Sequence, residues 1–112
     1  MPSVFVTGHN GFIGTHLCTK LLTKGYVVDV DMRNLRTKKY DAIIHLAAVT
    51  HTGVDFDPNI YYSNFLLTFD IMKQPTRIVY ASSCSAAHLT NPYAYSKRWS
   101  EHLGSLHSNA IG

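Results

Sequence analysis

Apolar and polar positions follow two alternating patterns along this chain: short β-rich runs and longer segments with helical spacing. The short runs are rich in valine and isoleucine and end near turn-forming residues, which is typical of buried strands. They predict four strands, at residues 4–6, 27–31, 41–46 and 77–80. The longer segments predict three helices, over about 13–24, 58–73 and 93–107.

The three predicted helices differ in the width of their apolar face. The expected stripes are Ile13, Leu17, Leu21 and Leu22 in the first helix and Tyr95, Trp99, Leu103 and Leu106 in the third. The second helix is apolar nearly all round, which predicts burial on two sides. The sheet would cover one side, and a partner subunit is the candidate for the other.

The alternation of strands and helices predicts an α/β fold with a parallel sheet and right-handed crossovers. We expect a minimal Rossmann-like sheet of about four strands in the order 2-1-3-4, with three main helices in a single domain over residues 1–112. One connection is unusually short. Only nine residues, 32–40, separate the second strand from the third, fewer than the roughly ten to twelve that a crossover with a helix needs. A bare loop should therefore carry the chain past the first strand.

The composition fits a globular protein, with 112 residues, 46% hydrophobic, 15% charged and a net charge of +3. No nucleic-acid-binding motif, metal-ligand spacing or membrane-length apolar run is present. Two cysteines without metal-type spacing favour reduced thiols and a cytoplasmic location. The basic residues are scattered except for one cluster, which is either a solvated loop or a phosphate contact: Arg33, Arg36, Lys38 and Lys39.

Three glycines, Gly8, Gly11 and Gly14, separate the first predicted strand from the first helix. The first permits a tight turn, the second lets the backbone approach a pyrophosphate, and the third lets the helix pack on the strand. The helix N-terminus adds free N–H groups and the positive end of a dipole. This arrangement predicts a dinucleotide site.

A carboxylate follows at the end of the second predicted strand, where such sites bind the adenosine ribose. Asp31 is the candidate, with Asp29 on the same face as the alternative. A carboxylate repels a 2′-phosphate, so Asp31 favours NAD. The neighbouring Arg33 keeps NADP open as the alternative cofactor.

Tyr93 and Lys97 stand one helical turn apart, which puts a phenol and an ammonium on the same helix face. A free tyrosine has a pKa near 10, and a nearby ammonium favours its phenolate. Lys97 can also hydrogen-bond the nicotinamide ribose. Ser82, Ser83 and Ser85 follow the fourth strand at the carboxyl edge of the sheet, where a hydroxyl can either polarise a carbonyl or cap backbone groups of a turn.

These motifs together resemble the extended short-chain dehydrogenase/reductases, in particular the NAD-dependent epimerase/dehydratase group that acts on nucleotide sugars. The similar segments are residues 7–14, 41–48, 79–83 and 92–97 and the single residue Asn64. The resemblance runs from Ser3 to Gly112. It implies Tyr93 as acid/base, Lys97 as its electrostatic partner and Ser83 as the hydroxyl that orients the substrate.

The resemblance also implies a cofactor-binding set: Gly8, Asn10, Gly11, Phe12, Ile13, Gly14, Asp31, Leu46, Ala47, Ala48, Asn64 and Lys97. The implied partners are a small-molecule substrate of the nucleotide-sugar class and a second copy of the chain, joined through helices 58–73 and 93–107. No nucleic acid or membrane partner is expected. Thr50, His51 and Tyr62 either line the active site or serve as ordinary surface residues.

The chain departs from the family pattern in three places. The segment between Asp31 and Asp41 and the stretch from Ser83 to Tyr93 are both shorter than is usual in the family. The family's later strands and C-terminal sugar-nucleotide domain have no counterpart in the sequence. Three interpretations stay open: a small oxidoreductase or epimerase, a non-catalytic dinucleotide-binding module completed by another chain, and a fragment of a longer protein.

Overall fold

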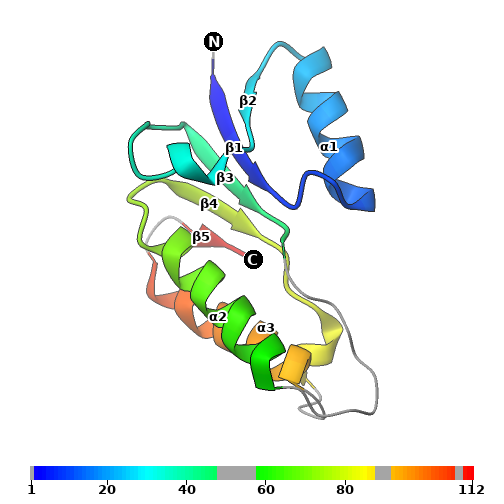
Figure 1. Cartoon of the computed structure of the whole chain (residues 1–112), viewed down its shortest axis with the longest axis vertical. Helices are drawn as coiled ribbons and strands as arrows, with labels where there is room; N and C mark the ends of the chain where they lie inside the picture. Colours follow the sequence, from blue (N-terminus) through cyan, green and yellow to red (C-terminus); the bar gives the residue numbers. More distant parts are fainter. Residues whose placement is uncertain (1, 48–57, 88–91, 108–109) are drawn as a thin grey trace.

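Five parallel strands form a single sheet in the computed structural model, which describes residues 2–47, 58–87, 92–107 and 110–112 (Figure 1). The strands are β1 (Ser3–Thr7), β2 (Val27–Asp29), β3 (Ala42–His45), β4 (Arg77–Tyr80) and β5 (Ala110–Ile111). Their order is β2-β1-β3-β4-β5. The predicted α/β class and the order of the first four strands are confirmed, and β5 adds a short fifth strand beside β4.

The main helices are α1 (Phe12–Thr23), α2 (Pro58–Met72) and α3 (Pro92–Leu106), and two short 3-10 turns are η1 (Met32–Asn34) and η2 (Cys84–Ala87). Right-handed crossovers require α1 to lie on the opposite face of the sheet from α2 and α3, and Figure 1 shows this arrangement. Within the described residues, no helix is long and apolar enough to span a membrane.

The core lies between the sheet and α2. Alternate strand residues, Phe5, Ile43 and Ile78, are at most 1% exposed and pack against Ile71 of α2. Tyr80 at the end of β4 completes this cluster. Successive side chains of a strand point to opposite faces. In β4, Ile78 and Tyr80 point into this core, so the strand alternates strictly between exposed and buried positions.

The connection from β2 to β3 has no crossover helix, as its length predicts; η1 is its only helical turn. Leu35 enters the core from this connection and is 3% exposed. The strand prediction over 27–31 was two residues too long. The Asp29 carboxylate accepts the Asp31 N–H at 3.0 Å, which turns the chain away from the sheet before residue 31.

Two of the predicted helix stripes are wrong in part. Ile13 and Leu22 of α1 are 64% and 60% exposed, while Leu17 and Leu21 are half-buried. In α3, Tyr95 and Trp99 are each 45% exposed and Leu106 is 84% exposed. The buried face of α3 consists instead of small and polar residues: Ala94, Ser96, Lys97, Ser100 and Gly104.

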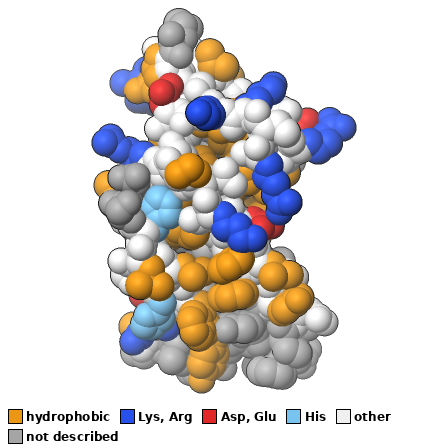
Figure 2. Space-filling view, turned by 90° about the vertical axis from the view of Figure 1, so that its left-hand side faces the viewer, with side chains coloured by type: hydrophobic (Ala, Val, Ile, Leu, Met, Phe, Trp, Pro, Cys, Tyr) orange, Lys and Arg blue, Asp and Glu red, His pale blue; other side chains and the backbone are white. Residues whose placement is uncertain are grey.

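Close packing explains this reversal in α3. A Cβ atom on Gly104 would overlap the Tyr80 ring of β4, so large side chains cannot face the sheet at this level. The aromatic residues therefore point outward. α2 behaves similarly: it packs against α3 and β3 on one side, and Leu66 and Phe69 stay exposed on the other. Figure 2 shows hydrophobic side chains gathered over the end of the molecule that α2 and α3 form.

Candidate functional site

The turn between β1 and α1 is built on two glycines that touch. Gly8 has a φ of +78°, in the left-handed region that side chains avoid. Its carbonyl accepts the Gly11 N–H at 3.1 Å. A Cβ atom on Gly14 would overlap the same carbonyl oxygen, and one on Gly8 would lie 2.9 Å from the Ala47 nitrogen. The glycine pattern therefore sets both the turn and its contact with the end of β3.

The N-terminus of α1 is open to an anion. Gly11 is the N-cap residue and gives no side-chain hydrogen bond, and the first turn contains no acidic residue. The first N–H groups of a helix have no partner within it, and together with the helix dipole they favour a phosphate. Asn10, Phe12 and Ile13 are all exposed beside this opening.

The end of β3 lies directly against the glycine turn. The N–H groups of Leu46 and Ala47 both donate to the Thr7 hydroxyl at 3.1 Å. The parallel register pairs Thr7 with His45, so the carboxyl ends of β1 and β3 form one edge. Ala48, the last cofactor-binding residue predicted in this segment, lies outside the described residues, as do Thr50 and His51.

At the far end of β2, Asp31 forms an ion pair with Arg33. The guanidinium donates to both carboxylate oxygens, from Nε to Oδ1 at 3.0 Å and from Nη2 to Oδ2 at 2.8 Å. This hydrogen bonding lowers the pKa of Asp31 to about 2, so the carboxylate is ionised at neutral pH. The pair is at the surface, where the Arg33 side chain is 90% exposed.

Asp29 has a different set of partners. Its carboxylate accepts from the Tyr40 hydroxyl at 2.7 Å and from the Asn34 side chain at 3.0 Å. These contacts tie the β2–β3 connection together and lower the pKa of Asp29. Both carboxylates thus have partners, and Asp31 is the one whose partner, Arg33, lies on the surface.

Lys97 is the most unusual residue of the predicted catalytic group because it is a buried lysine. Its side chain comes from the sheet-facing side of α3 and is only 6% exposed. Nζ donates to the Ala81 carbonyl at 3.0 Å and lies 5.7 Å from the centre of the Tyr93 ring. Burial lowers the pKa of Lys97. Tyr93 itself is half-buried.

The serines after β4 lie next to this pair. Ser83 is half-buried, and its carbonyl accepts the Ala86 N–H at 3.0 Å, which starts η2. The neighbouring Ser82 donates to Glu101 of α3 at 2.6 Å. Ser83 follows Ala81 by two residues, so the segment that holds Lys97 also carries the third predicted catalytic residue.

Two other predicted residues lie elsewhere. Asn64 of α2 is 5% exposed and its amide donates to the Ser96 hydroxyl at 3.1 Å, so it joins α2 to α3. Tyr62 is 60% exposed on the outer side of α2. The structure thus brings the glycine turn, Leu46 and Ala47 together, and groups Lys97 with Tyr93 and the β4 end.

Comparison with known proteins identifies the family of the chain. The profile of the NAD dependent epimerase/dehydratase family matches residues 4–110. The chain belongs to this family. No curated protein sequence matches the chain.

Solved structures of the epimerase/dehydratase fold match nearly the whole chain. A dTDP-4-dehydrorhamnose reductase from Yersinia enterocolitica superimposes with a TM-score of 0.84 at 21% identity, covering 98% of this chain and 50% of that one. The Helicobacter pylori ADP-L-glycero-D-manno-heptose-6-epimerase gives 0.75 at 19% identity, covering 96% and 51%. A Bacillus cereus UDP-N-acetylglucosamine 4-epimerase gives 0.74 at 23% identity, also covering 96% and 51%. The chain spans about half the length of these structures.

One feature of this epimerase/dehydratase chain escaped the sequence analysis: a buried layer of polar side chains between the sheet, α2 and α3. Its members are Thr7, His45, Asn64, Thr68, Ser96 and Ser100. A signal for it exists in the sequence, since His45 is a lone polar residue in an apolar strand and Ser96 and Ser100 share one helix face. The partners lie 23 to 38 residues away along the chain, so the pairing itself cannot be read from local pattern.

Proposed function

We propose that this chain binds a nicotinamide dinucleotide and performs oxidoreductase chemistry of the epimerase/dehydratase type with Tyr93, Lys97 and Ser83. The observation that carries the proposal is the burial of the Lys97 ammonium beside the Tyr93 ring. Lysine is almost never fully buried unless its charge has a partner. Groups with perturbed pKa values cluster at functional sites.

The residues at the glycine turn fit a dinucleotide. The space that a Cβ atom on Gly8 or Gly14 would fill is taken by backbone, which leaves the α1 N-terminus uncovered by side chains. The pyrophosphate would accept from the first N–H groups of α1. Asp31 would accept from the adenosine ribose hydroxyls, and this favours NAD over NADP.

In the proposed mechanism, the bound nicotinamide supplies a hydride acceptor or donor at its C4 position. Tyr93 removes the proton of a substrate hydroxyl, or returns it in the reverse direction. The Lys97 ammonium, 5.7 Å from the Tyr93 ring centre, stabilises negative charge that develops during the proton transfer and can hydrogen-bond the cofactor ribose. Ser83 orients the substrate oxygen. We infer a nucleotide-sugar substrate from the family, because its solved members include a UDP-sugar epimerase and a dTDP-sugar reductase.

A panel of nucleotide sugars with NAD and NADP tests this chemistry. Replacing Tyr93 by Phe keeps the ring and removes the phenol, so turnover should fall by roughly 100-fold or more while NAD affinity stays within about twofold. The matched control is Tyr95→Phe, which alters an exposed residue of the same helix and should keep full turnover. Equal turnover by the wild type and Tyr93→Phe would contradict the proposed role. NAD binding without any turnover would instead favour a non-catalytic module.

The Asp31–Arg33 pair gives a separate test of cofactor choice. Asp31→Asn should weaken NAD binding by about tenfold, because a charge-assisted acceptor for the ribose is lost. Arg33→Ala should leave NAD binding nearly unchanged and weaken NADP binding relative to the wild type. If Arg33→Ala lost NAD affinity as strongly as Asp31→Asn, the assignment of the ribose to Asp31 would be wrong.

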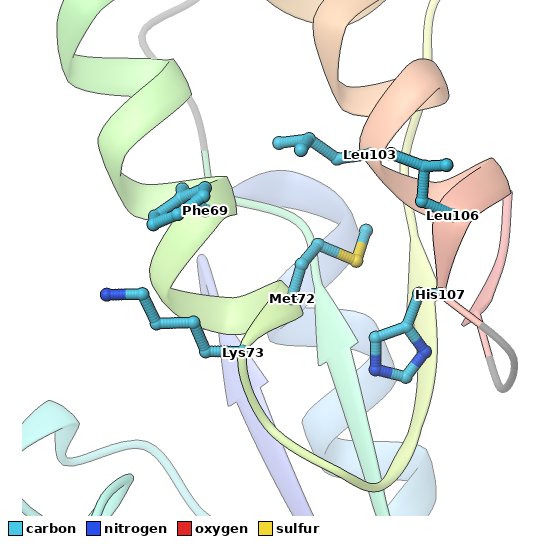
Figure 3. Close-up of a pocket in the computed structure, with 6 residues that line it drawn as sticks. All are labelled: Phe69, Met72, Lys73, Leu103, Leu106 and His107. Atoms are coloured by element: carbon cyan, nitrogen blue, oxygen red, sulfur yellow. The ribbon is translucent and has the colours of Figure 1, made fainter.

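We also propose a homodimer through the outer faces of α2 and α3. These faces expose large apolar side chains from both helices: Tyr62, Leu66, Phe69, Tyr95, Trp99 and Leu106. A groove of about 180 Å³ separates the C-terminal ends of the two helices. In Figure 3, Phe69 and Met72 of α2 and the adjoining Lys73 line one side, and Leu103 and Leu106 of α3 and the adjoining His107 line the other. Exposed large apolar side chains that gather on one surface are typical of an interface.

A further inference from the structure

His45 lies at the centre of the buried polar layer, where it joins β1 to α2. It is 4% exposed. Its Nδ1 lies 2.7 Å from the Thr7 hydroxyl and its Nε2 lies 3.0 Å from the Thr68 hydroxyl. Both ring nitrogens therefore have a hydroxyl partner, and each partner can either donate or accept a proton.

Counting protons at Thr7 decides which nitrogen carries the hydrogen. The Thr7 hydroxyl oxygen already accepts the N–H groups of Leu46 and Ala47, both at 3.1 Å, and the Leu46 N–H is shared with the Thr7 backbone carbonyl at 3.3 Å. A hydroxyl has two acceptor lone pairs, so both are in use and its proton must go to His45 Nδ1. That nitrogen is then the bare acceptor, and Nε2 carries the hydrogen and donates to Thr68.

These hydrogen bonds connect His45 to the glycine turn. With its proton held by His45, the Thr7 hydroxyl faces both backbone N–H groups at the end of β3. One of them belongs to Ala47, whose nitrogen packs against Gly8 so tightly that a Cβ atom on Gly8 would come within 2.9 Å. The position of the Gly8 turn is thus linked to His45 through Thr7 and Ala47.

We propose that His45 is a positioning residue of the dinucleotide site. As the neutral tautomer with hydrogen on Nε2, it orients the Thr7 hydroxyl, and that hydroxyl holds the β3 end against the Gly8 turn. The proposal rests on the proposed function in one respect, that the glycine turn receives the dinucleotide. His45 does not touch the cofactor in this account.

The charge environment supports the neutral form. A second ring hydrogen on Nδ1 would face a Thr7 oxygen with no free lone pair. Lys97 of α3 adds a like charge, and the Tyr80 phenol of β4 is paired with His45 in register. Burial, with a smaller contribution from Lys97, lowers the pKa of His45 to about 4.

Nuclear magnetic resonance of the wild-type chain tests the tautomer directly. The ¹⁵N shifts of the His45 ring should show a bare Nδ1 and a protonated Nε2 at neutral pH. The amides of Leu46 and Ala47 should exchange slowly with solvent, because both are hydrogen-bonded. A protonated Nδ1 would overturn the proposal whether or not the chain binds a nucleotide.

Two pairs of variants test the positioning. His45→Leu removes the acceptor for the Thr7 proton, whereas His45→Asn can place an amide oxygen near the Nδ1 position. Thr7→Val removes the hydroxyl, whereas Thr7→Ser keeps it. We expect His45→Leu and Thr7→Val to weaken NAD binding about tenfold and to speed amide exchange at Ala47, with Asn and Ser restoring most of both.

The outcomes separate this proposal from the proposed function. If the wild type binds neither NAD nor NADP, the proposed function fails and, with it, the site that His45 is said to serve. If the wild type binds NAD and His45→Leu binds it equally well with unchanged exchange at Ala47, the positioning role fails alone. Should His45→Leu not fold, the ring tautomer and the Thr7→Ser and Thr7→Val pair decide the question.

Discussion

Gly14 and Gly11 differ in what a single added carbon would meet. A Cβ atom on Gly14 would overlap the Gly8 carbonyl, whereas one on Gly11 would lie 3.4 Å from it, in ordinary contact. Gly14→Ala should therefore lower the free energy of unfolding by about 2 kcal/mol or more, whereas Gly11→Ala should cost less than about 1 kcal/mol. Urea denaturation followed by circular dichroism measures both. Equal losses would contradict the packing role assigned to Gly14.

His45 gives the fold a pH dependence of known sign. Its pKa is lowered in the folded state from 6.5 to about 4, so the unfolded chain takes up a proton first. Stability should therefore fall as the pH drops from 6.5 towards 4, by about 1.4 kcal/mol per pH unit and roughly 3 kcal/mol in all. Denaturation at several pH values measures this slope, and His45→Asn serves as the control. The same slope in the variant would show that other groups are responsible.

Residues with a role set by local spacing could be found from the sequence. Gly8, Gly14, Tyr93 and Lys97 stand at fixed offsets in a turn or on a helix, so their types and separations carry the signal. The Thr7–His45 contact could not be found this way. It joins positions 38 residues apart, and only the register of β1 with β3 brings them together.

At the scale of elements, the β2–β3 connection could be predicted from its length alone, because nine residues are too few for a crossover with a helix. The packing of Leu35 from this connection into the core could not be predicted. Leu35 is a single apolar residue among basic and polar neighbours, and nothing in its surroundings sets it apart from a solvated loop residue. Tertiary packing against Phe5, Ile43 and Ile71 gives it a place in the core.

Leu35 should therefore stabilise the fold more than its loop position suggests. Leu35→Ala should lower the free energy of unfolding by about 2–4 kcal/mol, since it leaves a cavity under α2. Leu22→Ala is the matched control on α1, because that side chain is 60% exposed and should cost less than about 1 kcal/mol. Chemical denaturation of the two variants measures the difference. A loss at Leu35 no larger than at Leu22 would mean that the connection is not part of the core.

The third helix shows why an apolar stripe can mislead at this scale. Its aromatic residues follow helical spacing and were expected to face the sheet. The sheet side is too close for them, as the contact of Gly104 with Tyr80 shows. The helix instead turns its small and polar face inward, and this places Lys97 beside the end of β4. The error in the stripe and the burial of Lys97 have the same cause.

At the scale of the whole molecule, the outward aromatic residues lead to the proposed dimer. Trp99 packs edge-on against Phe65 and against His102, and yet it remains 45% exposed. A Trp99→Glu substitution should dissociate the dimer, because it places a charge in the apolar interface. Leu22→Glu is the control on the opposite side of the sheet. Sedimentation equilibrium measures both, and a wild-type chain that stays monomeric at high concentration would exclude the interface.

The sequence supports the parallel sheet because strands and helices alternate along the chain, except at the short β2–β3 connection. The sequence determines less about function. The motifs identify the family, and the chain spans about half the length of the solved structures it matches. Substrate and turnover therefore depend on contacts that local motifs do not describe.

The most direct test of the account is calorimetric titration of the whole chain with NAD⁺, NADH, NADP⁺ and NADPH. The geometry of the Gly8–Gly14 turn and the carboxylate of Asp31 predict saturable binding of one nucleotide per chain, tighter for NAD(H) than for NADP(H). Gly11→Ala should weaken this binding while the chain stays folded, because the backbone approaches the pyrophosphate there. Absence of binding by all four nucleotides to a folded wild-type chain would contradict the central claim.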